Sequence, residues 1–220
     1  MDPLRRTSLV AGGCYVLTFV SIPTVALYGP VHDADYLVGT ASDTPVVLGA
    51  VLEVIVALAC IGTAVVLYPV LKRCGETRAL GFVSARVLEA AGIFVGVASL
   101  LTVVSLRRTG AGADALVTGQ TLVAFYDSIF LLSQGFLPAV NALLLGSLLY
   151  QSRLVPRVLP VLGLVGVPLL VVSDVGTLFG LWDRLSPVTA LAALPIAVWE
   201  FSLGVYLIVK GFRPSPVTGP

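Results

Sequence analysis

The chain has 220 residues, of which 57% are hydrophobic and only 11% are charged, and its formal net charge is +1. Soluble domains carry about 25% charged residues, so this composition excludes an ordinary soluble domain and indicates an integral membrane protein. A net charge this close to zero gives no basis for nucleic-acid binding, and we expect no nucleic-acid partner. Membrane lipid is the expected partner of most of the surface.

Six apolar stretches are long enough to cross a membrane as helices. They lie near residues 8–28, 46–71, 79–104, 121–149, 158–180 and 187–209. Each is close to or above the about 20 residues that a membrane-spanning helix needs. No polar stretch between them is long enough for a separate soluble domain. The sequence therefore predicts an all-α bundle of six helices, forming one transmembrane domain over residues 1–220 of a multi-pass cell-membrane protein.

The basic residues predict the orientation of this bundle. With the N-terminus in the cytoplasm, only Arg107, Arg108 and Arg184 lie in outer connections, and nine other Lys and Arg residues lie on the cytoplasmic side. This asymmetry follows the positive-inside rule, so both termini are expected to be cytoplasmic. The longest connection, residues 29–45, is then an outer loop that holds His32 and no basic residue. We interpret it as a solvated acidic loop.

The histidine and cysteine content predicts the absence of a cofactor. His32 is the only histidine, and the three cysteines form no CxxC motif. This pattern favours neither a zinc or haem site nor a disulfide framework. We expect no metal and no cofactor.

Carboxylates within the predicted spans are the strongest functional signal of the chain. A charged carboxylate near the centre of a bilayer costs about 2.5–3.5 kcal/mol on insertion scales. Such groups are therefore expected to be paired, to be protonated or to surround a polar cavity. Their depths along the predicted helices are compatible with one shared site. The residues concerned are Glu53, Glu89, Asp127, Asp174 and Glu200.

The third span carries a pair of opposite charges on one helix face. Arg86 and Glu89 are spaced i,i+3, which brings their side chains together, and Arg86 is the only basic residue within a span. A structural ion pair is one interpretation. In the alternative, Arg86 bridges to Glu200 and leaves Glu89 unpaired. Further along, Gly92 and Gly96 form a GxxxG pattern, which predicts close packing of another helix.

The fourth span carries a polar stripe. Asp127, Gln134 and Asn141 are seven residues apart, which is nearly two helical turns, so the spacing predicts that they share one face. The stripe is either a set of hydrogen bonds between helices or the wall of a polar cleft. Pro138 lies on the same stripe and is expected to bend the helix.

Aromatic residues stand beside the acids in the sequence. The face of an aromatic ring stabilises a cation, so these residues are candidates for lining a cavity that holds a lipophilic small molecule. Ordinary core packing is the alternative. The candidates are Phe125, Tyr126, Phe179 and Trp199.

Short motifs distributed over nearly the whole chain resemble those of a known family. They are LYPVLK at 67–72, RVLE at 86–89, SRLVPR at 152–157, Trp199-Glu200, and VKGF at 209–212. Together they resemble the bacterial membrane family called domain of unknown function 4386. The resemblance implies a six-helix fold with Arg86, Glu89 and Glu200 at positions typical of the family. It implies no activity, and the other three intramembrane acids lie outside the family's pattern.

Our first functional hypothesis is an intramembrane acid–base enzyme with a lipophilic substrate. Its most specific form is a terpene cyclase that starts the reaction by protonating an alkene or epoxide of a prenyl chain. Glu53 and Glu200 are the first candidates for the acid and the base, followed by Asp127 and Asp174. Integral-membrane terpene cyclases of similar size use buried carboxylates in this way, but none of their local motifs occurs here, so the argument is an analogy.

Two alternatives belong to other functional classes. Acids at several depths, together with the polar stripe of the fourth span, also fit a proton-coupled small-molecule transporter or channel. Six spans without a clear internal repeat are few for a monomeric transporter, so this hypothesis implies a homodimer. The third hypothesis is a non-catalytic membrane partner or sensor that acts through helix contacts.

Overall fold

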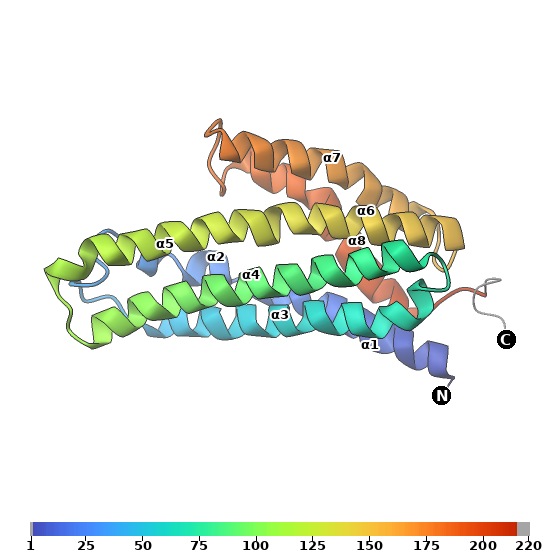
Figure 1. Ribbon diagram of the computed structural model, residues 1–220, viewed down its shortest axis with the longest axis horizontal. Coiled ribbons are helices and arrows are strands. Elements are labelled where there is room, and N and C mark those ends of the chain that lie inside the picture. The colour runs from blue at the N-terminus through green and yellow to red at the C-terminus, as the bar shows by residue number, and fades with distance from the viewer. Residues whose placement is uncertain (1, 215–220) are drawn as a thin grey trace.

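The computed structural model describes residues 2–214 and, within them, contains helices and no strands. It forms an elongated bundle (Figure 1). Six of its helical segments are long and apolar enough to cross a membrane, which confirms the predicted all-α, six-span architecture. These segments are Pro3–Leu27, Thr44–Leu71, Glu76–Arg108, Ala113–Ser152, Val158–Leu178 and Pro187–Val209.

The first span is built from three short helices. α1 (Pro3–Leu17) continues into the 3₁₀-helix η1 (Thr18–Ser21), and α2 (Thr24–Leu27) follows. The break coincides with Pro23, whose nitrogen has no hydrogen to donate to a helical carbonyl. The hydroxyls of Thr18, Ser21 and Thr24 each donate to the carbonyl three residues earlier, so side chains satisfy part of the backbone there.

The fourth span changes its helical type halfway. It runs from η3 (Ala113–Ala115) through α5 (Leu116–Phe130) and the π-helical turn η4 (Leu131–Phe136) into α6 (Leu137–Ser152). The π turn ends two residues before Pro138, which cannot donate to the preceding turn. Because a π turn holds more residues than an α turn, it rotates the face of α6 relative to α5. The predicted stripe is therefore divided between two faces.

The other spans are continuous helices: α3 (Thr44–Leu71), α4 (Glu76–Arg108), α7 (Val158–Leu178) and α8 (Pro187–Val209). Each span packs against the next around a ring in the order α1, α3, α4, α5–α6, α7, α8 and back to α1. In this ring α4 lies opposite α8. Side chains that join these two helices must therefore cross the interior of the bundle.

Close approaches of glycine to bulky neighbours hold the ring together. A Cβ on Gly92 would lie 2.4 Å from Ser133 Cβ, and one on Gly96 would lie 3.1 Å from the ring of Tyr126. The GxxxG pattern thus packs against the fourth span, as predicted. On the other side of the bundle, a Cβ on Gly163 would lie 2.5 Å from the indole of Trp199. Any side chain at these glycines would push the helices apart.

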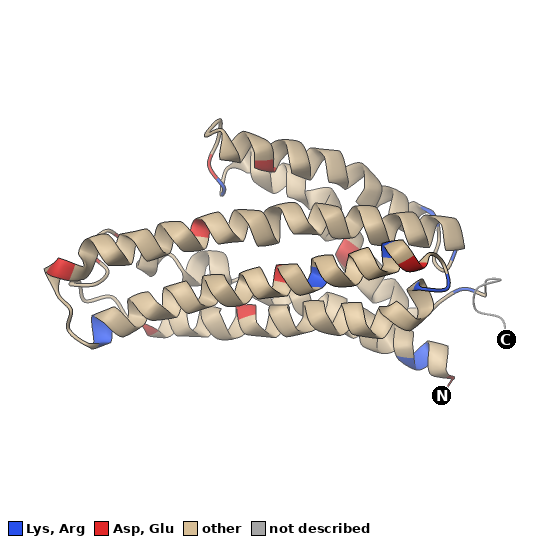
Figure 2. Ribbon diagram, viewed as in Figure 1, with Lys and Arg blue, Asp and Glu red and all other residues tan. Residues whose placement is uncertain are grey.

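Both described ends of the chain lie at one end of the bundle. The Arg5 guanidinium donates hydrogen bonds to the carbonyls of Leu207 and Ile208, which ties α1 to the end of α8. Lys and Arg residues gather at this end (Figure 2). Following the predicted orientation, we call it the inner end and call the opposite end, with loops 28–43, 109–112 and 179–186, the outer end. Which side of the membrane each end faces stays a prediction.

Candidate functional site

A buried arginine joins two carboxylates inside the ring. Arg86 of α4 is 1% exposed, and its Nη1 lies 3.0 Å from Glu89 Oε2. Its Nη2 lies 2.5 Å from Oε1 of Glu200, on the opposite helix α8. Arg86 therefore pairs with both acids at once. The predicted ion pair with Glu89 and the alternative bridge to Glu200 are both present, and Glu89 is not left unpaired. We call Arg86, Glu89 and Glu200 the central ion cluster.

Neighbouring side chains support this cluster. Asn141 donates its amide to the same oxygen of Glu89, at 2.7 Å. The rings of Tyr15 and Phe82 lie 5.2 and 5.8 Å from the guanidinium carbon of Arg86, and Cys60 Sγ lies 3.5 Å from Nη1. A desolvated guanidinium gains both from its carboxylate partners and from aromatic faces. These contacts offset the cost of removing the charges from water.

The central ion cluster lies in the wall of a cavity of about 230 Å³, which we call the central cavity. Every one of the six spans contributes to its lining, so it occupies the interior of the ring. At its edge Ile22 is exposed, so the cavity reaches the protein surface beside η1. The apolar part of the lining includes Phe19, Ile22, Val56, Pro138, Leu170, Ala193, Ile196 and Ala197.

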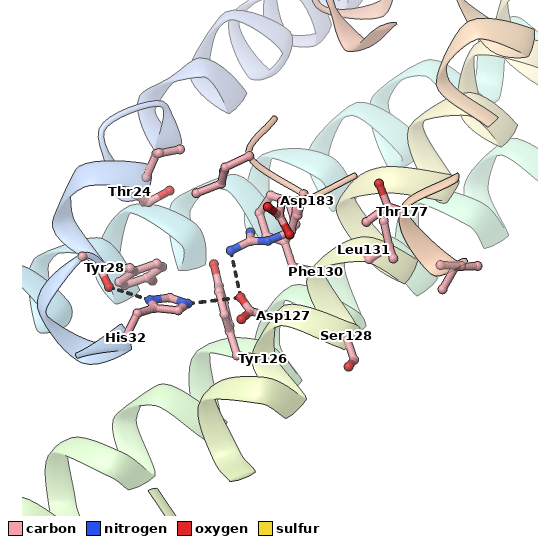
Figure 3. A pocket seen from close by; sticks show the side chains of 15 residues that line it. Thr24, Tyr28, His32, Tyr126, Asp127, Ser128, Phe130, Leu131, Thr177 and Asp183 are labelled. Atoms are coloured by element: carbon pink, nitrogen blue, oxygen red, sulfur yellow. Dashed lines mark hydrogen bonds and ion pairs between the residues drawn. The ribbon is translucent and has the colours of Figure 1, made fainter. Parts of the chain in front are cut away.

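A second, larger cavity of about 630 Å³ opens at the outer end, and we call it the outer cavity (Figure 3). Asp127 points into it from α5, and its Oδ1 lies 3.2 Å from His32 Nε2 and 2.8 Å from Arg184 Nη2. His32 and Arg184 come from two different outer loops, so Asp127 ties both loops together. The guanidinium carbon of Arg184 lies 4.4 Å from the centre of the Phe130 ring, which also lines the cavity.

The same contacts set the charge of the histidine. The hydrogen bond to Asp127 raises the pKa of His32, and burial opposes this effect. The hydrogen bond to the Tyr28 carbonyl and the negative charge of Asp127 act in the raising direction, and the nearby Arg184 charge acts against it. Folding therefore makes His32 easier to protonate than it is in an unfolded chain.

Glu53 of α3 lies between the two cavities. It is buried, and its Oε1 accepts a hydrogen bond of 2.9 Å from the Tyr126 hydroxyl and one of 3.4 Å from the Gln134 amide. Tyr126 lines the outer cavity and Gln134 lines the central cavity. Within residues 2–214 the second oxygen, Oε2, has no hydrogen-bond partner, although the Tyr28 phenol is close to the carboxyl. Glu53 therefore receives a hydrogen bond from the wall of each cavity.

Asp174 of α7 stands apart from the other acids. It is 1% exposed, and its carboxyl packs against Gly135 of the π turn, where a Cβ would lie 3.0 Å from Oδ2. No hydrogen bond reaches Oδ2 from the part of the chain that the structure describes. The acids therefore do not meet in one shared site: Asp174, Glu53, Asp127 and the central ion cluster have different partners.

The aromatic residues predicted to line a cavity take different positions. Tyr126 lines the outer cavity. Phe125 on α5 and Phe179 directly after α7 are 46% and 80% exposed and line neither cavity. Trp199 is fully buried against Gly163 within the apolar core and lies outside the lining of both cavities. Their role in substrate binding stays a prediction.

Sequence reasoning missed the partners of Asp127. His32 was assigned to a solvated loop, and Arg184 was counted only for orientation. The available signal was weak: Arg184 is a basic residue on the predicted outer side, where basic residues are few. Across residues 2–214 no three His, Cys, Asp or Glu side chains come together in a way that could hold a metal ion.

A family profile described as "Domain of unknown function (DUF4386)" matches residues 10–211. The chain belongs to this family. Comparisons with curated proteins and with solved structures found no match. In this DUF4386 protein, the three residues that the resemblance placed at family-typical positions, Arg86, Glu89 and Glu200, are those of the central ion cluster.

Proposed function

We propose that this DUF4386 protein is a proton-coupled transporter of a small organic molecule. The observation that supports it most is the position of Glu53, which accepts one hydrogen bond from the wall of the outer cavity and one from the wall of the central cavity. A carboxylate that separates two cavities within a membrane is well placed to couple a proton to the passage between them.

The arrangement of open and packed regions supports this proposal. The outer cavity gives access from the outer end, and the central cavity is lined by all six spans. Toward the inner end, the largest cluster of buried apolar side chains fills the bundle, with Leu71, Phe82, Leu145 and Leu203 among its members. Such a structure corresponds to the outward-facing state of an alternating-access cycle.

The chemistry of a carboxyl group supplies the coupling step. An ionised Glu53 only accepts hydrogen bonds, so it holds the Tyr126 hydroxyl and the Gln134 amide together. A protonated Glu53 carries a donor of its own and binds both partners less strongly. Proton binding therefore loosens the contact that separates the two cavities.

The enzyme hypothesis is the second candidate. Two of its four candidate acids, Asp127 and Glu200, line the cavities but are paired with arginine, whereas Glu53 and Asp174 line neither cavity. In its favour, the outer cavity combines the Tyr126 and Phe130 rings with a volume that suits a drug-sized ligand. Terpene cyclisation thus stays a proposal, as does a sensor role, and both rank below transport.

The native thiol of Cys60 tests the transport proposal without a known substrate. Cys60 lines the central cavity, and Cys14→Ala with Cys74→Ala leaves it as the only thiol. We expect a membrane-impermeant methanethiosulfonate, added from the outer side of whole cells, to label Cys60 at a rate that depends on pH. Glu53→Gln should change the rate at least tenfold at one end of pH 5–8, because the proton-dependent contact is lost.

The intrinsic pH dependence of thiol reactivity is removed by comparing variants at the same pH. Glu76→Gln is the matched control, since Glu76 is an exposed carboxylate at the inner end of α4, and it should label like the parent. A Cys60 that stays unreactive at every pH would overturn the proposal. Equal rates for the parent and Glu53→Gln at every pH would overturn it as well.

A further inference from the structure

We infer that the central cavity binds a small organic cation with an apolar body, such as a lipophilic amine, and that its charge is held by Glu89 and Glu200. The first reason is the charge of the central ion cluster. One guanidinium faces two carboxylates, which leaves one negative charge in excess when both acids are ionised. An uncompensated charge inside a membrane protein is costly, so a monovalent cation stabilises this site.

The second reason is the hydrogen bonding of the two carboxylates. Arg86 engages Oε2 of Glu89 and Oε1 of Glu200, and Asn141 adds a second bond to Oε2 of Glu89. From residues 2–214 no hydrogen bond reaches the other oxygen of either group. Glu89 is 5% exposed and, like Glu200, lines the central cavity. A nearly buried carboxylate that lines the cavity thus has one oxygen that accepts no hydrogen bond from the described residues.

The third reason is the character of the remaining wall. Aliphatic and aromatic side chains from η1, α3, α7 and α8 surround the acids, and Phe19 offers an aromatic face for a cation. The polar side chains outside the central ion cluster, Thr18, Ser21 and Gln134, already donate hydrogen bonds to Tyr15, Thr18 and Glu53. The rest of the wall is mostly apolar and suits an apolar body. The volume of about 230 Å³ limits the ligand to roughly one ring with a short substituent.

This ligand class deepens the proposed function. A proton and an organic cation both neutralise the excess charge, so binding of one disfavours binding of the other. The statement that the cation is transported rests on the proposed transport function, whereas its binding to the cavity does not.

The test is equilibrium binding of benzyltrimethylammonium to the purified full-length protein in nanodiscs. We expect saturable binding with a Kd below about 1 mM. Benzyl alcohol, which is uncharged, and benzoate, which is an anion, should compete at least tenfold more weakly because they share the ring and lack the positive charge. Absence of saturable binding, or equal competition by benzyl alcohol, would overturn the inference.

Two variants locate the site. Glu200→Gln removes the excess charge and should weaken binding at least tenfold. Ala197→Phe fills the cavity from α8 without changing any charge and should also abolish binding, which keeps the inference testable if Glu200→Gln does not fold. Glu76→Gln, at an exposed position, should bind like the parent. Unchanged binding by folded Ala197→Phe protein would place the ligand elsewhere.

The two experiments can refute the transport function and the cation site independently of each other. If benzyltrimethylammonium binds but Glu53→Gln does not alter Cys60 labelling, the cation site stands and the transport function falls. If labelling depends on Glu53 but no cation binds, the transport function stands and this ligand class is wrong.

Discussion

At the scale of residues, the energetics depend on how each buried charge is satisfied. Arg86 is tolerated inside the membrane because two carboxylates and the rings of Tyr15 and Phe82 surround it. Removing one partner from a buried group of this kind typically costs about 3–5 kcal/mol, because a charge is left without compensation. Asp127 belongs to a different class, since its ion pairs with His32 and Arg184 lie at a solvent-accessible cavity and are individually weaker.

The outer contact of Asp127 should make stability depend on pH through His32. The hydrogen bond to Asp127 raises the pKa of His32 in the folded state. The contribution of this contact to the free energy of unfolding is therefore complete below the ordinary histidine pKa of about 6.5. It is lost as the pH rises through the raised pKa of the folded state. We expect the parent protein to melt a few degrees above His32→Gln at pH 5.5, and this difference to shrink by pH 8.5.

Thermal unfolding in detergent, followed by intrinsic fluorescence, measures the difference. Because His32 is the only histidine in the chain, no other imidazole contributes to the change. A melting difference that stays constant or grows between pH 5.5 and 8.5 would contradict the assigned contact.

At the scale of elements, the fourth span determines how the site is divided. The π turn η4 separates α5, which presents Asp127 to the outer cavity, from α6, which presents Asn141 to the central ion cluster. Gln134 lies within the turn, lines the central cavity and donates a hydrogen bond to Glu53, which also accepts one from Tyr126 in the wall of the outer cavity. The turn is held against α4 by Gly92, which has no side chain where Ser133 approaches.

Substituting alanine for two glycines should have opposite effects. Gly92→Ala places a methyl group 2.4 Å from Ser133 Cβ and should destabilise the protein by about 1–3 kcal/mol, because the helices must move apart. Gly13→Ala on α1 meets nothing within 4 Å and should be neutral or stabilising by up to about 1 kcal/mol, because alanine favours helix. Melting temperatures of both variants beside the parent test this pair. A Gly92→Ala protein as stable as Gly13→Ala would refute the close packing.

At the scale of the whole molecule, the six spans form a ring. Its largest apolar cluster packs the inner end, and at the outer end the outer cavity opens beside a second apolar cluster. A homodimer, which the transport hypothesis implied, stays a prediction. The orientation of the ring in the membrane decides which compartment the outer cavity faces. The distribution of basic residues predicts this orientation, and it can be measured directly.

Single thiols at the two ends should report the orientation. In a background lacking Cys14 and Cys60, native Cys74 lies in the inner loop between α3 and α4, and Asp33→Cys places a thiol in the outer loop. In intact cells, an impermeant maleimide should label the Asp33→Cys protein in which Cys74 is also replaced. The protein that keeps Cys74 as its only thiol should be labelled only after the cells are permeabilised. The reverse pattern would invert the orientation and would turn the outer cavity toward the cytoplasm.

Local patterns predicted much of the structure. Hydropathy predicted six spans, and the i,i+3 spacing predicted that Arg86 and Glu89 would meet. The GxxxG pattern predicted close packing. The π turn was not predicted, although Pro138 marked a disturbance of the helix there. The isolation of Asp174 was not predicted either, because helix depth alone does not say which side of the ring a residue faces.

The sequence by itself determined the class of the protein, its spans and the position of each acid along them, because hydropathy acts over neighbouring residues. Tertiary structure alone decided how those acids are grouped. It placed Glu200 opposite Arg86, 114 residues away, and joined Asp127 to His32 and Arg184 from two separate loops. Such contacts depend on the order of helices around the ring and on small rotations of each helix, which no local pattern records.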